Sequence, residues 1–409
     1  MYKTVSIVGA GLAGCEAALQ LAKKGFRVTL YDAKPKVLLS TYSFPSFAEL
    51  VCNNSLAPNS SDTALGLLVS ELKVMGSELI AAAELCRIDD DKYFAVDKKK
   101  FSKTISQKLM ESGVTIINET ITTMPEDEIV ILASGPLTNE VLIKDVSKKY
   151  GVNGYHFADA SSVIVDITSV DLNNSNISRI TDDLFAVNIP QEVFSVFCRM
   201  LKDFSAHSTS HGSKEIEFEK CLSLERLAVK GDAVLSETRF HHPYQEGNCL
   251  LLRRENGLEK GYIMVGCMTT LCYSDQRSAF SILPGFNKVK ILKYGRMHRN
   301  TFFNSPEILD CFYKVRNDNL YIIGQLSGTD GYAPAIAGGL VAALRIIKGE
   351  GIRPFPRETM IGGLAYYISN KEVIDYQPMC ASFSLLKGSK TLDYYENSMK
   401  ALKEYKKTL

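Results

Sequence analysis

Short apolar runs alternate with amphipathic stretches along the chain, most regularly over its first forty residues. Val5–Val8 form a mostly apolar run typical of a buried parallel strand. Ala17–Lys24 carry apolar residues at helical spacing, and Gly25 ends this pattern. Phe26–Tyr31 have the composition of a second strand. The order strand, turn, helix and strand predicts a β-α-β unit with parallel strands.

A glycine-rich turn joins the first predicted strand to the helix. In GAGLAG, Gly9, Gly11 and Gly14 have GxGxxG spacing, and Asp32 closes the second strand. Gly9 suits a tight turn, Gly11 lets a pyrophosphate approach the backbone, and Gly14 lets the helix pack on the strand. Asp32 can accept hydrogen bonds from ribose hydroxyls. This complete context predicts a dinucleotide site rather than a glycine turn without a ligand.

A second glycine turn occurs late in the chain. Leu320–Ile323 form a predicted strand, followed by a turn and then a helix of small residues that extends to Ile347. Such a late unit often closes the flavin site in flavoproteins, with the helix N-terminus facing the isoalloxazine ring, so FAD is favoured over NAD. A third piece, EIVILASGPLT, resembles the turn near the pyrophosphate of such enzymes. The predicted FAD contacts therefore add Gly135, Gly324, Gly328 and Gly331 to the first turn.

These patterns predict an α/β protein with a Rossmann-like FAD-binding fold and an inserted α+β domain. The chain has 409 residues, which is too many for one ordinary core. Because the late unit returns to the dinucleotide fold, we expect a discontinuous FAD domain at 1–150 and 285–409, with the inserted domain at 151–284. The 47 basic residues nearly balance the 46 acidic ones, so any nucleic-acid partner would need a local basic surface.

Lysine-rich runs are candidates for such a surface. They occur at 96–103, 145–151 and 400–407. Each is more often a solvated helix face than an RNA contact, although together they can supply phosphate contacts.

Cysteine and histidine usage narrows the class of protein further. The ten cysteines form no CxxC pair, which favours a cytoplasmic protein with reduced thiols. No signal segment is recognised and no apolar run reaches about 18 residues, so no membrane span is expected. His207 and His211 lie four residues apart without neighbouring ligands, and we expect no metal site. The oligomeric state stays open.

Three segments contain candidate site residues. Cys52 lies in SFAELVCNNSL and Cys221 in FEKCLSLERLA. Residue type alone favours buried packing for either cysteine. After a predicted strand at Val289–Leu292, the polar stretch GRMHRNTFFNSP groups His298, Arg299 and Asn300 at a strand end. Convergent polar groups of this kind favour a site for an anionic or heteroaromatic ligand.

Taken together, these segments resemble the folate- and FAD-dependent RNA uracil-5-methyltransferases, distant relatives of the glucose-inhibited division protein A group. The resemblance covers nearly the whole chain, and its FAELVC and YG-MHRNTF-NSP blocks are specific to the family. The matching blocks are GAGLAGCEAA, FAELVCNNSL, ALGLLVSELKVMGS, AVDKKKFS, ASGPLT, FEKCLSLE, LPGFNKVKILKYGRMHRNTFFNSP and GQLSGTDGY.

The resemblance implies a reaction and roles for the candidate residues. Methylenetetrahydrofolate would give its one-carbon unit, through reduced FAD, to C5 of a uridine in RNA, and NAD(P)H would supply the electrons. Cys52 and Cys221 match the family's two functional cysteines; which of them attacks C6 is left open. His298, Arg299 and Asn300 fall on the block that lines the family's folate site.

The chain departs from the family pattern at 38–46, 159–166 and 238–256. The substrate therefore stays open between the T-loop uridine of tRNA and large-subunit ribosomal RNA. A flavin-dependent oxidoreductase acting on a small molecule and a non-catalytic folate- and flavin-binding RNA scaffold are the alternatives.

Overall fold

The structure is a computed structural model, and its contacts divide the chain into two compact units. It describes residues 3–38, 44–51, 54–88, 93–152, 154–207, 222–242, 246–255, 260–387 and 393–409. Unit 1 comprises Met1–Tyr155 and Thr301–Leu409, and unit 2 comprises His156–Asn300. Both divisions fall within strands, β7 (Gly154–Asp166) and β13 (Arg296–Phe303).

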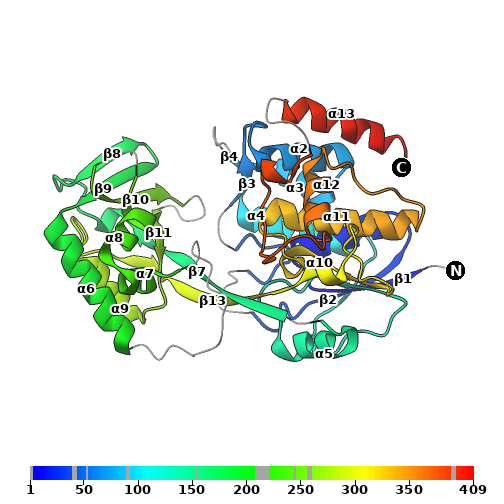
Figure 1. Ribbon diagram of the computed structural model, residues 1–409, viewed down its shortest axis with the longest axis horizontal. Helices are drawn as coiled ribbons and strands as arrows, with labels where there is room; N and C mark the ends of the chain where they lie inside the picture. The colour runs from blue at the N-terminus through cyan, green and yellow to red at the C-terminus, as the bar shows by residue number, and fades with distance from the viewer. Residues whose placement is uncertain are drawn as a thin grey trace. The chain divides into compact units, whose positions relative to one another are not determined.

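A five-stranded parallel sheet forms the centre of unit 1 (Figure 1). Its strands are short and mainly apolar, as expected for a sheet with both faces covered. In spatial order they are β14 (Leu320–Ile322), β6 (Ile129–Leu132), β1 (Thr4–Val8), β2 (Arg27–Tyr31) and β5 (Thr115–Ile117). The predicted strands at the N-terminus, at Glu128–Thr138 and at Leu320 are therefore confirmed.

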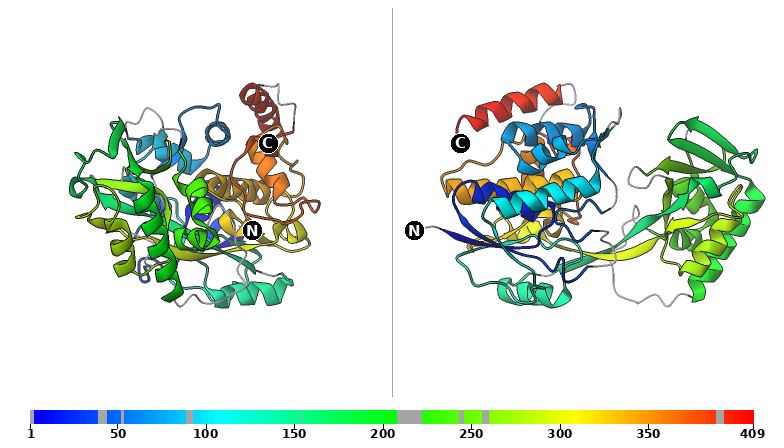
Figure 2. Two further views of the ribbon diagram at one scale, coloured as in Figure 1. Left: turned by 60° about the vertical axis from the view of Figure 1, so that its left-hand side comes forward. Right: turned by 180° about the vertical axis from the view of Figure 1, so that it is seen from behind.

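Helices cover the sheet of unit 1 on both faces. Figure 2 shows α1 (Leu12–Ala22), α4 (Lys98–Glu111) and α11 (Tyr332–Lys348) side by side over one face, and α1 packs against both of the others. On the other face lies α5 (Glu140–Tyr150) (Figure 1). The remaining elements of this unit are β3 (Ser55–Pro58), α2 (Ala64–Met75), α3 (Glu78–Leu85), β4 (Tyr93–Ala95), α10 (Ser305–Ile308), α12 (Met360–Tyr367) and α13 (Tyr394–Lys406).

The first helix begins inside the glycine turn, at Leu12, rather than at Ala17 as the apolar spacing predicted. The first turn of the helix, LAGCE, which the prediction left out, is wholly buried. It therefore has no exposed polar face from which a helical period could be detected. Close packing explains this burial, because a Cβ on Gly339 of α11 would lie 2.3 Å from the carbonyl oxygen of Ala13.

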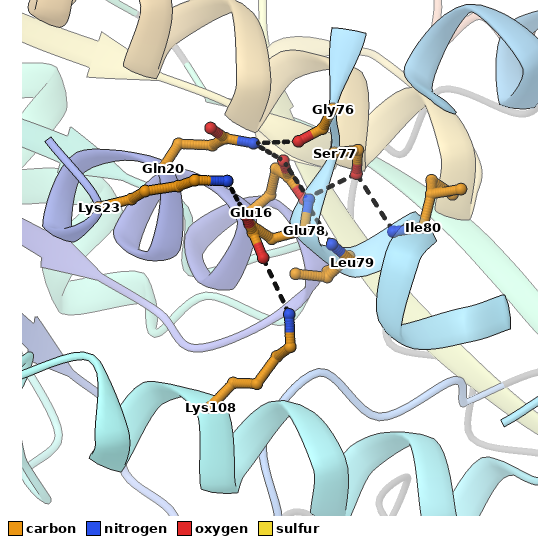
Figure 3. A network of polar contacts seen from close by, with 9 residues as sticks. All are labelled: Glu16, Gln20, Lys23, Gly76, Ser77, Glu78, Leu79, Ile80 and Lys108. Carbon is orange, nitrogen blue, oxygen red and sulfur yellow. Dashed lines mark hydrogen bonds and ion pairs between the residues drawn. The ribbon is translucent and has the colours of Figure 1, made fainter. Parts of the chain in front are cut away.

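Glu16 on α1 is completely buried and ties α1 to the start of α3 (Figure 3). Its carboxylate accepts from the hydroxyl of Ser77 at 2.8 Å and from the N–H of Leu79 at 2.9 Å. It also accepts from the N–H of Glu78 and from the side chain of Gln20. The first N–H groups of a helix have no partner within the helix, so they are available to donate to this carboxyl group, whereas burial raises its pKa.

Glu71 on α2 is also completely buried and ties α2 to two C-terminal helices. It accepts from the N–H groups of Met360 and Ile361, at 2.6 and 2.8 Å, where α12 begins. The hydroxyl of Ser398 on α13 donates to the same carboxylate. Burial raises the pKa of Glu71 to about 7, against the opposing effect of these donors.

Unit 2 is built on an antiparallel sheet with helices packed around it. Helix α6 (Gln191–His207) packs against α7 (Leu224–Lys230) and α9 (Tyr273–Ser281), and the apolar core includes Phe194, Phe197 and Phe280. The strands, in spatial order, are β12 (Ile291–Lys293), β7, β11 (Gly261–Met268), β10 (Asn248–Arg254), β9 (Leu184–Ile189) and β8 (Ile177–Thr181), with β13 also paired to β7. A further helix of this unit is α8 (Asp232–Leu235).

The second division of the chain, between Asn300 and Thr301, differs from the expected boundary at 284/285. The expected boundary followed the composition of the chain, whereas β12 and β13 both pair with β7. Strand pairing therefore keeps residues 285–300 with unit 2.

Among the described residues, no helix has both the length and the apolar character needed to cross a membrane.

Candidate dinucleotide site and the segment before Cys52

The first glycine turn has the geometry that a dinucleotide-binding turn requires. Gly9 has φ +106°, and a Cβ there would lie 2.4 Å from the carbonyl oxygen of Ala133. A Cβ on Gly14 would lie 1.9 Å from the carbonyl oxygen of Gly9. Larger residues would therefore push the turn away from β6 and α1 away from the turn.

Gly11, by contrast, has no atom within 4 Å of the position its Cβ would take. This open space lies at the N-terminus of α1, where backbone N–H groups and the helix dipole favour a phosphate. The turn therefore fits the pyrophosphate of a dinucleotide.

Asp32 follows β2 directly and points to the same turn. One carboxylate oxygen accepts from the N–H of Ala10 at 2.7 Å, and the other accepts from the N–H of Lys34 at 2.8 Å. Each oxygen keeps a further lone pair, so the carboxylate is held in place and can still accept from a ribose.

The late glycine turn packs against α1 and against a C-terminal segment. A Cβ on Gly324 would lie 3.2 Å from the Cβ of Ala13. At Gly328, the Tyr376 hydroxyl lies 2.2 Å from the position of a Cβ and donates to the carbonyl oxygen of Ser327 at 2.6 Å. The space beside Gly328, which the sequence analysis assigned to the cofactor, is thus occupied by the side chain of Tyr376. The sequence analysis did not predict this contact. Gly331 precedes α11 directly, at φ +106°.

The third glycine turn contacts the block that contains the predicted folate residues. Gly135 has φ +77° and open space at its Cβ position. The next residue, Pro136, accepts from the N–H of Thr301 at 2.8 Å. The structure therefore brings the Gly135 turn together with the end of β13.

The predicted folate residues lie within a strand rather than at a strand end. His298, Arg299 and Asn300 all belong to β13. The polar composition of this stretch hid the strand, which pairs with β7. Asn300 is buried, with 5 % of its surface exposed, and the side chains of His298 and Arg299 lie outside the described structure.

Cys52 and Cys221 themselves lie outside the described residues, but the segments on both sides of Cys52 are described. Before Cys52, the N–H of Ala48 donates to the carbonyl oxygen of Ala10 in the first glycine turn at 2.9 Å. The peptide groups of Phe47 bond to α4, its N–H to Ser106 at 2.9 Å and its carbonyl oxygen to Ser102. The predicted cofactor turn and the segment that leads to Cys52 are therefore in direct contact.

Lys34 adds a third connection to this segment. Its ammonium group is buried, donates to the carbonyl oxygen of Ser46 at 2.8 Å and lies 4.0 Å from the carboxylate of Glu49. Burial lowers the pKa of Lys34, whereas the neighbouring Asp32 and Glu49 act in the opposite direction. The sequence signal was a lysine two residues after the predicted ribose acid, which alone is too common to single out.

Burial raises the pKa values of several of the described cysteines. The pKa of Cys15 lies far above its usual range, because the thiol is completely buried beneath the glycine turn next to Asp32. Burial also raises the pKa of Cys267 to about 12 and that of Cys311 to about 11. A high pKa keeps a thiol protonated and poorly nucleophilic, which fits packing roles for these residues.

Comparison with known families agrees with this geometry. Residues 4–349 match the family described as glucose inhibited division protein A. The chain belongs to the glucose inhibited division protein A family. A solved family structure, Aquifex aeolicus GidA in its form II crystal, is similar over 100% of this chain and 73% of that chain, with a TM-score of 0.71 and 17% sequence identity. The expected Rossmann-like α/β fold with an additional domain is thereby confirmed.

Curated relatives within this family are more similar in sequence. The methylenetetrahydrofolate–tRNA-(uracil-5-)-methyltransferase TrmFO of Enterococcus faecalis is 37% identical, with 94% of this chain and 92% of that protein covered. The proteins of the same name from Bacillus subtilis and Acetivibrio thermocellus are 36% and 33% identical, over 94% and 98% of this chain and 92% and 98% of their own lengths. The family resemblance deduced from the sequence is confirmed.

Proposed function

We propose that this protein is a folate- and FAD-dependent methyltransferase that forms 5-methyluridine in tRNA. The observation that carries the proposal is the identity of 33% to 37% with three methyltransferases over at least 94% of the chain. The geometry of the first glycine turn supports it, because this turn fits a dinucleotide and contacts the segment before Cys52. Large-subunit ribosomal RNA has no support in the names of these relatives, and tRNA is therefore the proposed substrate.

The glycine turns and Asp32 would hold FAD. The backbone at Gly11 would receive the pyrophosphate and the Asp32 carboxylate would accept from the ribose. When bound and reduced, with electrons from NAD(P)H, the flavin supplies the means to accept a one-carbon unit from methylenetetrahydrofolate and deliver it. His298, Arg299 and Asn300 are the proposed folate contacts, with the imidazole ring against the pterin and the arginine at its polar edge or glutamate tail.

The protein's own groups would activate the uridine. C5 of uracil is a weak nucleophile until a thiolate adds to C6, which places electron density on C5. After the one-carbon unit has joined C5, a base removes the C5 proton and the thiolate leaves from C6. The two electrons that convert the methylene group to a methyl group would come from the flavin that NAD(P)H has reduced. We propose Cys52 and Cys221 as the nucleophile and its partner in this sequence.

The test follows label from methylenetetrahydrofolate into RNA. Purified protein receives the labelled folate, NADPH and either an unmodified tRNA transcript or fragments of large-subunit ribosomal RNA. We expect labelled 5-methyluridine in the tRNA. Label confined to the ribosomal RNA would overturn the proposed substrate, and label in neither RNA, with a flavin that NADPH reduces, would overturn the methyltransferase assignment in favour of an oxidoreductase or scaffold.

Cysteine variants test the proposed chemistry. Cys52→Ala and Cys221→Ala should each reduce methyl transfer to below about one-thousandth while the protein still binds flavin. Cys272→Ala is the matched control, because Cys272 is an exposed cysteine to which the proposal gives no role. Equal activity of the Cys52 variant and this control would contradict the assignment.

A further inference from the structure

Helix α4 and the residues just before it hold the chain on both sides of Cys52. Its buried serines, Ser102 and Ser106, bond the carbonyl oxygen and the N–H of Phe47, as described above. Just before the helix, the N–H of Val96 donates to the carbonyl oxygen of Asn54 at 2.9 Å, and β4 pairs with β3. The position of α4 is therefore coupled to the segment that contains Cys52.

The opposite face of α4 is exposed and basic. Lys99, Lys100 and Lys103 are exposed, and their spacings of three and four residues place them side by side on this face. The N-cap residue Asp97 directs its carboxylate to the N–H of Lys100 at 2.9 Å. The first turn contains no acidic residue. We call these three residues the α4 lysine face.

The positive charges on this face destabilise the helix that carries them. Lysines near a helix N-terminus meet the positive end of the helix dipole, and like charges three or four residues apart repel each other. The other two lysine-rich helices have the favourable order. In α5, Glu140 lies in the first turn and Lys148 and Lys149 in the last, and α13 likewise begins with an acid and ends with lysines. Helix stability therefore explains the last-turn lysines of α5 and α13, and Lys108 in the last turn of α4, but not the α4 lysine face.

We propose that the α4 lysine face binds the phosphate backbone of the RNA whose uridine is presented to the segment around Cys52. This inference rests on the proposed function. RNA fits this face because its phosphates form a dense row of negative charge, which complements the three neighbouring ammonium groups. Lysine contacts of this kind position an RNA without reading its sequence. The face therefore contributes affinity and not the choice of uridine.

The test compares two triple variants of the full-length, FAD-loaded protein. In the first, Lys99, Lys100 and Lys103 are all changed to glutamine. The control changes Lys144, Lys148 and Lys149 of α5 to glutamine, which removes the same charge from the same unit. For each protein, the dissociation constant of an unmodified tRNA transcript is measured over a series of salt concentrations. The rate of flavin reduction by NADPH is also recorded.

We expect the α4 variant to bind RNA at least about tenfold more weakly and to lose about 2 from the slope of log affinity against log salt, near 0.7 for each lost phosphate contact. Its KM for RNA should rise by a similar factor while flavin reduction stays unchanged. The α5 control should keep the affinity and the slope of the unmodified protein.

Equal affinity and slope in the two variants would overturn the proposal, as would an unmodified protein that does not bind RNA. Failure of the proposed function has a different signature. The unmodified protein would then bind RNA without transferring label, and the two salt slopes would still decide whether the α4 lysine face contacts phosphate.

Discussion

The interior of unit 1 and the surface of α4 treat the helix dipole in opposite ways. Inside, the carboxylates of Glu16 and Glu71 meet the N–H groups at the starts of α3 and α12. On the surface, lysines occupy the start of α4. The interior carboxyl groups accept from N–H groups that have no partner within their helix, whereas the surface lysines place positive charge at the positive end of the helix dipole. The comparison teaches that polar groups which hold the fold can be distinguished from the lysines that we propose for RNA binding.

Removal of the Glu71 carboxylate should have the largest effect. Glu71→Ala leaves two buried N–H groups of α12 and the hydroxyl of Ser398 without their acceptor, in addition to a cavity. Each unsatisfied group costs about 1–3 kcal/mol, so we expect the free energy of unfolding to fall by about 3–5 kcal/mol in urea titrations. A loss below about 1 kcal/mol would show that water replaces the carboxylate and that the interior half of the comparison is wrong.

The pH dependence of stability isolates the charge of Glu71. Its pKa is about 7 in the folded protein and 4.5 ordinarily, so the folded state binds the proton more tightly between these values. Protonated Glu71 therefore adds up to about 3 kcal/mol to the free energy of unfolding. This stabilisation is fully present below pH 4.5 and is lost as the pH rises to about 7. Urea titrations of the protein and of Glu71→Gln across this interval should differ in slope, with the variant flatter. Parallel curves would contradict the assignment.

Glu16→Gln should have a smaller effect. One carboxylate oxygen becomes an NH₂ group that faces donors, because Oε1 accepts from Gln20 and Glu78 while Oε2 accepts from Ser77 and Leu79. We expect a loss of about 1–3 kcal/mol in the free energy of unfolding. The substitution Lys23→Gln is a surface control, since Lys23 is exposed and pairs with Glu78 beside the network. An equal loss of unfolding free energy in both variants would show that the buried contacts of Glu16 are not the cause of the effect.

The smallest expected effect has the opposite sign. The triple α4 variant should be more stable than the unmodified protein by about 1 kcal/mol, because it relieves repulsion at the start of the helix. The triple α5 variant should be slightly less stable, by a few tenths of a kcal/mol, because it removes favourable charges from the last turn. Both are read from urea midpoints at low salt. Equal shifts of the urea midpoint in the two variants would show that the lysines of α4 and those of α5 affect stability in the same way.

Local patterns predicted the parts of the protein whose determinants are close together in the chain. The strands β1 and β2, the glycine spacing and the position of Asp32 all follow from residues within one β-α-β unit. The contacts of Phe47 and Ala48 with α4 and Ala10 were not predictable, because they join segments that have no common pattern. Tyr376 at Gly328 is a similar case. The β13 strand was missed because its pairing with β7, rather than its composition, makes it a strand.

The order of the strands also determines when each strand can find its partner during translation. Strand β14 pairs with β6, yet the ribosome must make the whole of unit 2 between Leu132 and Leu320. At ordinary rates of translation, this interval lasts on the order of ten seconds. Throughout it, the nascent chain presents an unpaired β6 edge, which is a template for wrong pairing. The first glycine turn emerges early, but the late turn that completes the predicted flavin contacts is made only after unit 2. A nascent chain stalled before Leu320 would therefore be the species most in need of a chaperone.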